Sequence, residues 1–251
     1  MKTHLFKLEC LTDMHVGSGE ANYSVIDNEV QKDTVLKDVP VIHASGVKGA
    51  LKEHFEIEWG IDDSKIKRIF GDKDNAGSYK FLSALCVARP LRVSSGDMPY
   101  VLCSAEDILK SFSALLEGLG MSEFYNYSGL AFDDNKKFVS AQSVEIEGEE
   151  CKVVENLGDA FAKLGLDNLA VAKTLRDYDL PVRARNVLDE NGQSKNLWYE
   201  ELVPHKSVFY FAVIVPDGKC ELEFRPTEPV QFGGNASVGN GYTTITEVTL
   251  Q

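Results

Sequence analysis

The longest apolar run in the chain, residues 208–215 (VFYFAVIV), is long enough for a buried strand and far too short for a membrane span. A helix needs ~20 apolar residues to cross a bilayer. The other apolar runs alternate with polar residues or recur at helical spacing. We therefore expect no membrane association and a core built from short strands and helices.

The composition is typical of a folded domain. Hydrophobic residues make up 43% of the 251 residues, and 13 Phe with 9 Tyr supply large side chains for packing. These values exclude an intrinsically disordered chain. The formal net charge of -13 argues against a protein that coats nucleic acid through its overall charge. A local basic groove stays compatible with that charge, because salt screens charges beyond ~10 Å.

Five cysteines are scattered through the chain without a CxxC pair: Cys10, Cys86, Cys103, Cys151 and Cys220. Their odd number, wide spacing and mostly apolar neighbours are typical of buried free thiols in a reducing compartment. The N-terminus opens directly into a strand-like alternation, so no secretory signal is expected. We predict a cytoplasmic protein without disulfides or a zinc site.

Hydrophobic periodicity predicts a single α+β domain over residues 1–251. Strands are expected at 5–11, 79–93 with a break at Pro90, 100–103 and 207–215. Helices are expected from an N-cap at Ser45, over 63–70, and from an acidic capping box at Ser104. Residues of about 20–40 are expected to form a protruding arm. A ferredoxin-like (RRM-like) β-α-β-β-α-β core fits this order best.

The segment of about residues 121–179 differs in composition from the rest. Between residues 121 and 160 it carries nine acidic residues and three basic ones. We interpret it as an acidic, helical insertion with its own helix at 156–164. Such an insertion would hold negative charge away from a nucleic-acid groove.

Glycines gather in three places, near residues 17–19, 46–49 and 233–241. Each cluster alone is more simply a tight turn. The second differs, because a helix N-terminus with a nearby lysine attracts an anion through its N–H groups and its dipole. The GxxxxGK[ST] phosphate loop is absent. The candidate anion contacts are Ser45, Gly46, Lys48, Lys52, Gly233 and Gly234.

Other single residues could carry chemistry, and each also has a structural interpretation. These are Asp27, His15, Glu200, Arg183 and Arg185. Asp27 could cap a turn, and His15 could be a core or turn histidine. The acidic pair at 200–201 could be a solvated edge, and the two arginines could pair with surface carboxylates. The sequence contains no zinc-binding HExxH motif and no evident catalytic triad.

Three motifs together resemble the RAMP superfamily of CRISPR proteins. Residues 11–19 (LTDMHVGSG) resemble the family's LTPLHVGSG, and residues 41–51 (VIHASGVKGAL) resemble PYIPGSSLKGAL. Residues 24–32 (SVIDNEVQK) resemble GVIDLPVQRE, the block that separates the repeating backbone subunit of type III-B (Cmr) complexes from other RAMP proteins. Segments 180–185, 197–201 and 232–241 follow in the family's order.

The chain departs from the family pattern at three points. Asn28 and Glu29 stand where Leu-Pro is usual, and residues 44–46 (ASG) replace Gly-Ser-Ser. Residues 81–84 (FLSA) replace Phe-Ser-Asp-Ala, so no role is expected for a carboxylate there.

The resemblance implies a RAMP palm and several copies stacked along a CRISPR RNA with other Cmr subunits. It implies that the arm of each copy wedges into the guide–target duplex, and that target RNA is cut at regular intervals in a divalent-metal-dependent reaction, with Mg²⁺ or Mn²⁺ expected. Asp27 matches the catalytic aspartate and metal ligand, while Glu200 and His15 match positions near the cut. Lys48 and its helix end match guide-backbone contacts.

Two alternatives remain open at this point. One is a scaffold subunit that binds CRISPR RNA without cutting the target. The other is a stand-alone endoribonuclease that processes CRISPR precursor RNA.

Overall fold

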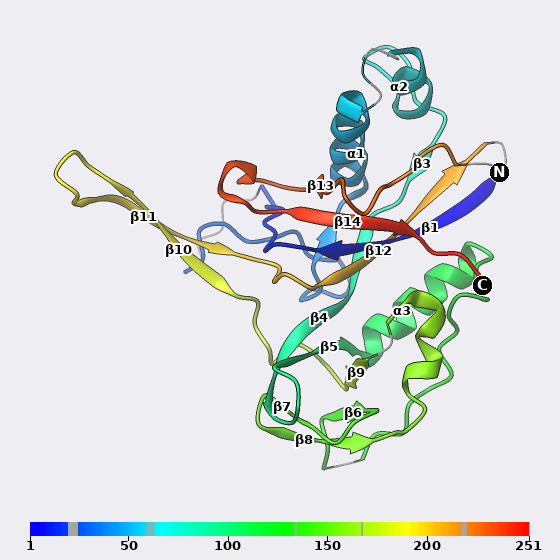
Figure 1. Cartoon of the computed structure of the whole chain (residues 1–251), viewed down its shortest axis with the longest axis vertical. Helices are drawn as coiled ribbons and strands as arrows, with labels where there is room; N and C mark the ends of the chain where they lie inside the picture. Colours follow the sequence, from blue (N-terminus) through cyan, green and yellow to red (C-terminus); the bar gives the residue numbers. More distant parts are fainter. Residues whose placement is uncertain are drawn as a thin grey trace.

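The computed structural model describes residues 1–19, 25–58, 60, 63–133, 135–166, 168–216 and 220–250. Four antiparallel strands form the centre of the fold (Figure 1). In spatial order they are β14 (Tyr242–Glu247), β1 (Lys2–Cys10), β12 (Val208–Val215) and β4 (Ala84–Ser95). Helix α1 (Ala44–Glu58) connects β1 to β4, and β12 lies between them. This is the strand order of a ferredoxin-like domain, so the predicted α+β fold class is confirmed.

Aromatic side chains fill the space between the sheet and α1. Phe6 of β1 lies opposite Phe211 of β12, with their ring centroids 5.2 Å apart. The apolar face predicted for α1 is buried through Val47, Leu51 and Phe55. Burial of a Phe side chain contributes about 1.5–3 kcal/mol, so this layer is a main source of stability.

The connection from β12 to β14 differs from the expected order. Among its described residues, 220–241, it contains no α-helix, only β13 (Val230–Gln231) and the 3₁₀ turn η3 (Ala236–Val238). Phe224 lies 5.5 Å from Phe6 and 5.4 Å from Phe55 between ring centroids. One aromatic side chain thus covers the sheet beside α1, where a second crossover helix would otherwise pack.

Two sequence-based boundaries are wrong. Pro90 does not break its strand: β4 runs through it and pairs it with Leu102, at a point where the ladder to β12 has already ended. Proline is tolerated where one strand edge has no ladder partner. Ser104 does not cap a helix, because it is the penultimate residue of β5 (Tyr100–Ala105). Helix α3 (Glu106–Gly118) begins after it without a side-chain cap.

The regular secondary structure of the acidic insertion consists mainly of strands. It contributes β6 (Phe138–Ser140), β7 (Glu145–Ile146), β8 (Glu149–Val153) and β9 (Leu169–Ala172). These strands extend the sheet beyond β5, and β7 returns to pair with β4. The helix predicted at 156–164 is wrong; the 3₁₀ turns η1 (Gly158–Ala160) and η2 (Ala162–Leu164) lie there. Phe161 is buried between them, so packing rather than helical period sets this segment.

A two-stranded hairpin projects from the rest of the molecule (Figure 1). It consists of β10 (Val182–Leu188) and β11 (Ser194–Glu201), and neither pairs with any other strand of the described residues. The arm predicted at 20–40 does not project in the way that this hairpin does. Residues 20–24 lie outside the described residues, and the remainder lies partly against the core, with Val30 and Val39 buried.

The remaining short elements are β2 (Val41–Ile42), β3 (Lys80–Phe81) and α2 (Asp63–Phe70), the last with the bounds predicted from sequence. No helix of the described residues is long and apolar enough to cross a membrane. All five cysteines are buried free thiols. Burial raises the pKa of the Cys86 thiol to about 12, which keeps it protonated and unreactive at neutral pH.

Candidate active site at the base of the hairpin

Asp27 lies where the arm meets β11. The adjacent Asn28 runs parallel to the outer edge of that strand: its N–H donates to the Tyr199 carbonyl at 3.1 Å, and its carbonyl accepts the Glu201 N–H at 2.9 Å. Asp27 Oδ2 accepts the Tyr199 N–H at 2.8 Å. The residue is exposed, and its Oδ1 makes no hydrogen bond to any described residue. One carboxylate oxygen is therefore held and the other faces solvent.

Glu200 is buried, with 5% of its surface exposed, so the interpretation as a solvated edge is wrong. Its Oε2 lies 3.3 Å from Arg185 Nη1 and accepts the Asn235 side-chain amide at 3.2 Å. Its Oε1 accepts the Trp198 ring N–H at 2.8 Å. Three donors thus contact this carboxylate, which links the hairpin to the glycine-rich loop at residues 233–241. A catalytic role for Glu200 stays a prediction.

Glu201, the next residue, is equally buried and faces the arm. Its carboxylate accepts the Val30 N–H at 3.1 Å and lies 3.0 Å from Lys32 Nζ. His15 Nδ1 lies 2.8 Å from the Glu201 carbonyl, so that nitrogen carries the proton. His15 is 8% exposed, which favours the structural interpretation of this residue.

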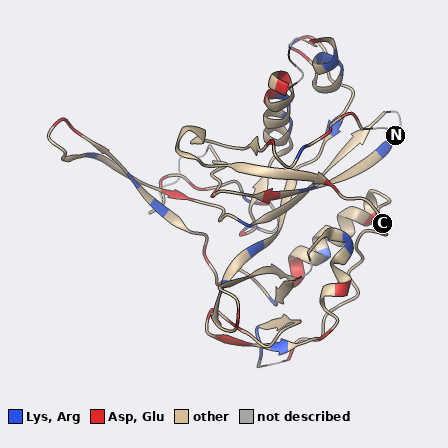
Figure 2. Cartoon of the chain, in the orientation of Figure 1, with Lys and Arg blue, Asp and Glu red and all other residues tan. Residues whose placement is uncertain are grey.

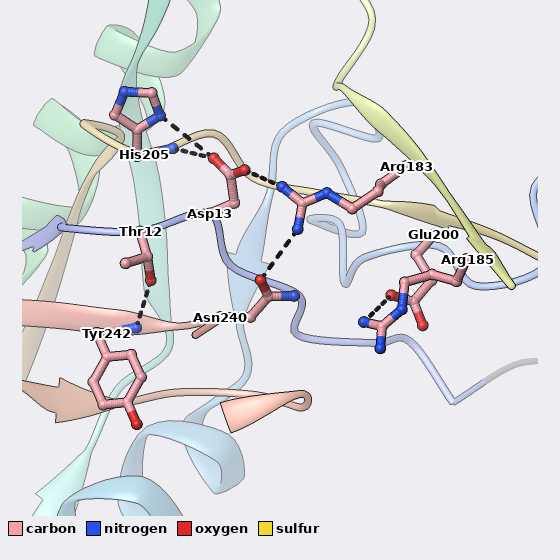
Figure 3. A network of polar contacts seen from close by, with 8 residues as sticks. All are labelled: Thr12, Asp13, Arg183, Arg185, Glu200, His205, Asn240 and Tyr242. Atoms are coloured by element: carbon pink, nitrogen blue, oxygen red, sulfur yellow. Dashed lines mark hydrogen bonds and ion pairs between the residues drawn. The ribbon is translucent and has the colours of Figure 1, made fainter. Parts of the chain in front are cut away.

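Asp13 connects the base of the hairpin to the palm (Figure 3). Its carboxylate lies 2.5 Å from Arg183 Nη2 and accepts the His205 N–H at 3.0 Å. Arg183 also donates to the Asn240 side-chain oxygen at 3.4 Å. The two arginines predicted from one strand face are therefore both engaged, Arg183 by Asp13 and Arg185 by Glu200.

The segment that enters β10 is held from the core by Arg89. Its guanidinium donates to the carbonyl oxygens of Leu175 at 3.3 Å and Asp179 at 3.2 Å, and also to that of Tyr178. Burial lowers the pKa of the Arg89 guanidinium. An arginine nevertheless stays charged in a protein, so these carbonyls retain a cationic partner.

Gly233 and Gly234 pack against the residues around His15. Gly233 has φ +77°, and a Cβ placed there would come 2.2 Å from the His15 carbonyl oxygen. The Gly234 N–H donates to that same oxygen at 2.9 Å. These contacts support the tight-turn interpretation of the third glycine cluster, and its predicted role in RNA binding stays a prediction.

The candidate anion contacts of the second glycine cluster lie apart from this site, in α1. The helix begins at Ala44, so Ser45 is in its first turn and is not the N-cap. The Ala44 N–H donates instead to the Ser83 hydroxyl at 3.1 Å. Gln31 joins this end to the first glycine cluster, because it accepts the His43 N–H at 2.9 Å and donates to the Gly17 carbonyl at 3.2 Å.

The other predicted anion contacts of this cluster, Gly46, Lys48 and Lys52, all lie in α1. Lys52 lies 3.5 Å from Glu56, whereas Lys48 is half-buried and makes no ion pair with a described residue. Gly46 lies one residue after Ser45, and its hydrogen in place of a side chain leaves room beside Ile42. Among the described residues, Lys48 is therefore a cation near the helix start without an acidic partner.

The described residues do not form a resident metal site. Among them, no three His, Cys, Asp or Glu side chains come together as possible ligands. The carboxylates of Glu200 and Glu201 already have protein donors, which leaves one Asp27 oxygen. Oxygen-rich sites for hard divalent cations need several such ligands.

Charge is distributed unevenly over the fold. The projecting hairpin carries both signs, with Lys and Arg along its strands and Asp and Glu at its tip and base, whereas much of the acidic insertion carries Asp and Glu around β7 and β8 (Figure 2). Some of those carboxylates are paired within the insertion, as in the contact of Lys137 with Glu149 at 2.6 Å. The hairpin has three basic residues and four acidic ones, so it is not cationic as a whole, and any basic contact surface on it is local.

Sequence reasoning missed three residues of this site. Glu201 was grouped with Glu200 as a possible edge, and Asp13 and Asn235 were noticed only as parts of longer motifs. The one available signal was the adjacency of two acidic residues in a strand, because neighbouring side chains point to opposite faces and reach different partners.

The chain was compared with known proteins. A model of the RAMP superfamily matches residues 7–243. Over 99% of its length the chain is 25% identical to the CRISPR system Cmr endoribonuclease Cmr4 of Pyrococcus furiosus, of which 97% is covered. It is 23% identical to the CRISPR system CMR subunit Cmr4 of Saccharolobus solfataricus, over 94% of this chain and 93% of that protein.

Solved structures show the same fold. A chain in the type III-B Cmr-beta complex bound to cognate target RNA has a TM-score of 0.81 at 22% identity, covering 99% of this chain and 98% of that one. Oligomeric Cmr4 from Pyrococcus furiosus has a TM-score of 0.72 at 20% identity, with 100% of both chains covered. The resemblance expected from the sequence motifs is confirmed. Because the family model spans nearly the whole chain and the folds agree over their full lengths, this protein belongs to the RAMP superfamily.

Proposed function

We propose that this chain is the repeating, target-cleaving backbone subunit of a type III-B CRISPR RNA-guided complex. The observation that carries the proposal is the Asp27 carboxylate, held at the base of a projecting hairpin with one oxygen facing solvent. Support also comes from the two relatives named Cmr4, one of which is named an endoribonuclease. Its partners are a CRISPR RNA, a target RNA, further copies of this chain and other Cmr subunits.

The proposed reaction uses the target's own 2′-hydroxyl. The 2′-oxygen attacks the adjacent phosphorus, the bond to the 5′-oxygen breaks, and the products carry a 2′,3′-cyclic phosphate and a 5′-hydroxyl. Asp27 Oδ1 accepts the proton of the 2′-hydroxyl, and water supplies a proton to the leaving 5′-oxygen. In-line geometry comes from a nucleotide displaced by the hairpin and arm, which lowers the barrier by orientation. We assign Glu200 and His15 to holding this site.

Guide binding is assigned to the start of α1, which Gln31 contacts through the His43 N–H. Lys48 with the N–H groups of Ser45 and Gly46 contacts the guide backbone, with Lys52 one turn further along. Arg183, Arg185 and the loop at Gly233 and Gly234 line the duplex near the cut. Such contacts read the backbone, so they are indifferent to guide sequence. The free cysteines suit assembly in the cytoplasm.

The first prediction concerns Asp27→Asn in the assembled complex. Target cleavage should fall by about 10²–10⁴-fold, the usual contribution of a positioned proton acceptor. Target affinity should not change, because base pairing carries it. Cleavage rate and target binding are measured on the same preparation, with Asp38→Asn as a control on an exposed surface carboxylate. A variant that cuts at the wild-type rate would contradict the role of Asp27, and a wild-type complex that binds without cutting would favour the scaffold function.

A single 2′-deoxy substitution immediately 5′ to one scissile phosphate should block that cut alone. The attacking hydroxyl is missing there, whereas neighbouring cuts are made by other copies and should continue. Gel analysis of end-labelled target measures each cut separately. Continued cleavage at the deoxy site, without a cyclic phosphate on the product, would indicate attack by water and overturn the proposed nucleophile.

A divalent cation, Mg²⁺ or Mn²⁺, is also part of the proposal. It would have one protein ligand among the described residues, Asp27 Oδ1, and would take its other ligands from phosphate oxygens and water. Asp27 would then hold the ion in place of accepting the 2′-hydroxyl proton. Chelation with EDTA should stop every cut without releasing the target, because binding rests on base pairing and on Lys and Arg contacts. The measurement compares cleavage and gel mobility of the complex before and after chelation. An undiminished rate in EDTA would show that the side chains act without a metal.

Lys48→Glu should impair guide loading before it affects chemistry. The substitution places a negative charge against phosphate at a helix N-terminus, where dipole and charge would then oppose each other. Guide loading is measured by co-purification of CRISPR RNA over a range of salt. The matched control is Lys110→Glu on α3, an exposed lysine outside this helix end. Equal loading and equal salt dependence in both variants would exclude the helix-end assignment.

A further inference from the structure

Glu201 has a buried carboxylate that is satisfied entirely by the arm. Only 5% of the residue is exposed. Oε2 accepts the Val30 N–H at 3.1 Å, and Oε1 lies 3.0 Å from Lys32 Nζ. A carboxylate this deeply buried is costly unless it is paired and hydrogen-bonded. The two donors on the arm therefore both stabilise the charge and are held in place by it.

The backbone of Glu201 adds two further contacts. Its N–H donates to the Asn28 carbonyl at 2.9 Å, and its carbonyl lies 2.8 Å from His15 Nδ1. One residue thus joins the arm at three successive points and also joins the loop that precedes the arm. Because Asn28, Val30 and Lys32 alternate along the arm, the contacts set the register of this segment against β11.

Asp27 itself has far less support. Its side chain is exposed, and the hydrogen bond from the Tyr199 N–H is the one hydrogen bond that this side chain makes with a described residue. Its place therefore depends on the register of the residues that follow it. If the Glu201 carboxylate were removed, the Val30 N–H would be left without a partner in a buried setting, which the arm would relieve by moving.

We propose that Glu201 is a positioning residue for Asp27: its carboxylate locks the register of residues 28–32 against β11 and so sets the place of the reacting carboxylate. Glu201 does not contact RNA. The inference rests on the proposed cleavage function. It differs from a role in general folding, because the hydrogen bond and the ion pair that the carboxylate makes with described residues are both made with the arm. Glu200, which holds the opposite flank through the glycine-rich loop, provides the comparison.

The test uses the reconstituted complex with Glu201→Ala, Glu201→Gln and Lys32→Met. Cleavage is measured in single turnover at saturating target, together with target affinity and amide hydrogen exchange of the peptide covering residues 25–32. Glu201→Ala should cut about 10–100-fold more slowly, since displacement of a reacting group by ~1 Å has an effect of that size. Target affinity should stay within about 2-fold, and exchange should accelerate in residues 25–32.

Glu201→Gln retains an oxygen that can accept the Val30 N–H, so it should recover most of the cleavage rate and of the exchange protection. Lys32→Met leaves that hydrogen bond in place and should resemble Glu201→Gln. A loss confined to general folding would instead lower target affinity and accelerate exchange throughout the chain in Glu201→Ala, which would overturn the proposal.

Other outcomes separate this inference from the proposed function. Wild-type cleavage by Glu201→Ala, despite faster exchange in the arm, would overturn positioning and leave the function intact. A wild-type complex that never cuts would refute the proposed cleavage function. Hydrogen exchange would still test whether Glu201 anchors residues 28–32. Faster exchange limited to residues 25–32 supports it, and unchanged exchange in Glu201→Ala refutes it.

Discussion

The outer edge of β11 is the constraint on which the candidate site depends. A two-stranded hairpin leaves unpaired N–H and C=O groups along its edges, and an isolated hairpin is only marginally stable in water. At the base of the hairpin, the edge groups of β11 do have partners: the strand pairs with Asn28, and the Tyr199 N–H donates to Asp27. The same pairing brings the carboxylate to the foot of the projection. Under the proposed function, a nucleotide displaced by the hairpin would therefore lie next to Asp27.

Two adjacent carboxylates hold that base from opposite faces. Side chains alternate along a strand, so Glu200 points toward the glycine-rich loop and Glu201 toward the arm. A buried carboxylate is tolerated only when donors surround it, and each of these has at least two. Loss of one donor would leave a charge under-satisfied, so the two flanks of the site resist movement. The exposed Asp27 remains the accessible group between them.

Charge is unevenly distributed over the fold, so the proposed binding of RNA is compatible with the negative total charge of the chain. Acidic residues are concentrated around β7 and β8 of the insertion, and the hairpin carries both signs (Figure 2). The first turn of α1 has no acidic residue, and Lys48 lies close to it. Screening limits each charge to its surroundings, so net charge says little about one groove. The hairpin arginines also have structural partners, Asp13 for Arg183 and Glu200 for Arg185, which orient them before any RNA arrives.

The sequence by itself determined the fold class, the bounds of α2, the apolar face of α1 and Asp27 as the candidate catalytic residue. Each of these depends on local periodicity or on a short motif. The tertiary structure alone decided that Pro90 lies inside a strand, that residues 156–164 form two 3₁₀ turns, and that Glu201 contacts the arm. Glu201 and Val30 are separated by 171 positions in the chain. No local pattern encodes which buried donor meets which buried carboxylate, because that pairing is set only when the strands and loops pack together.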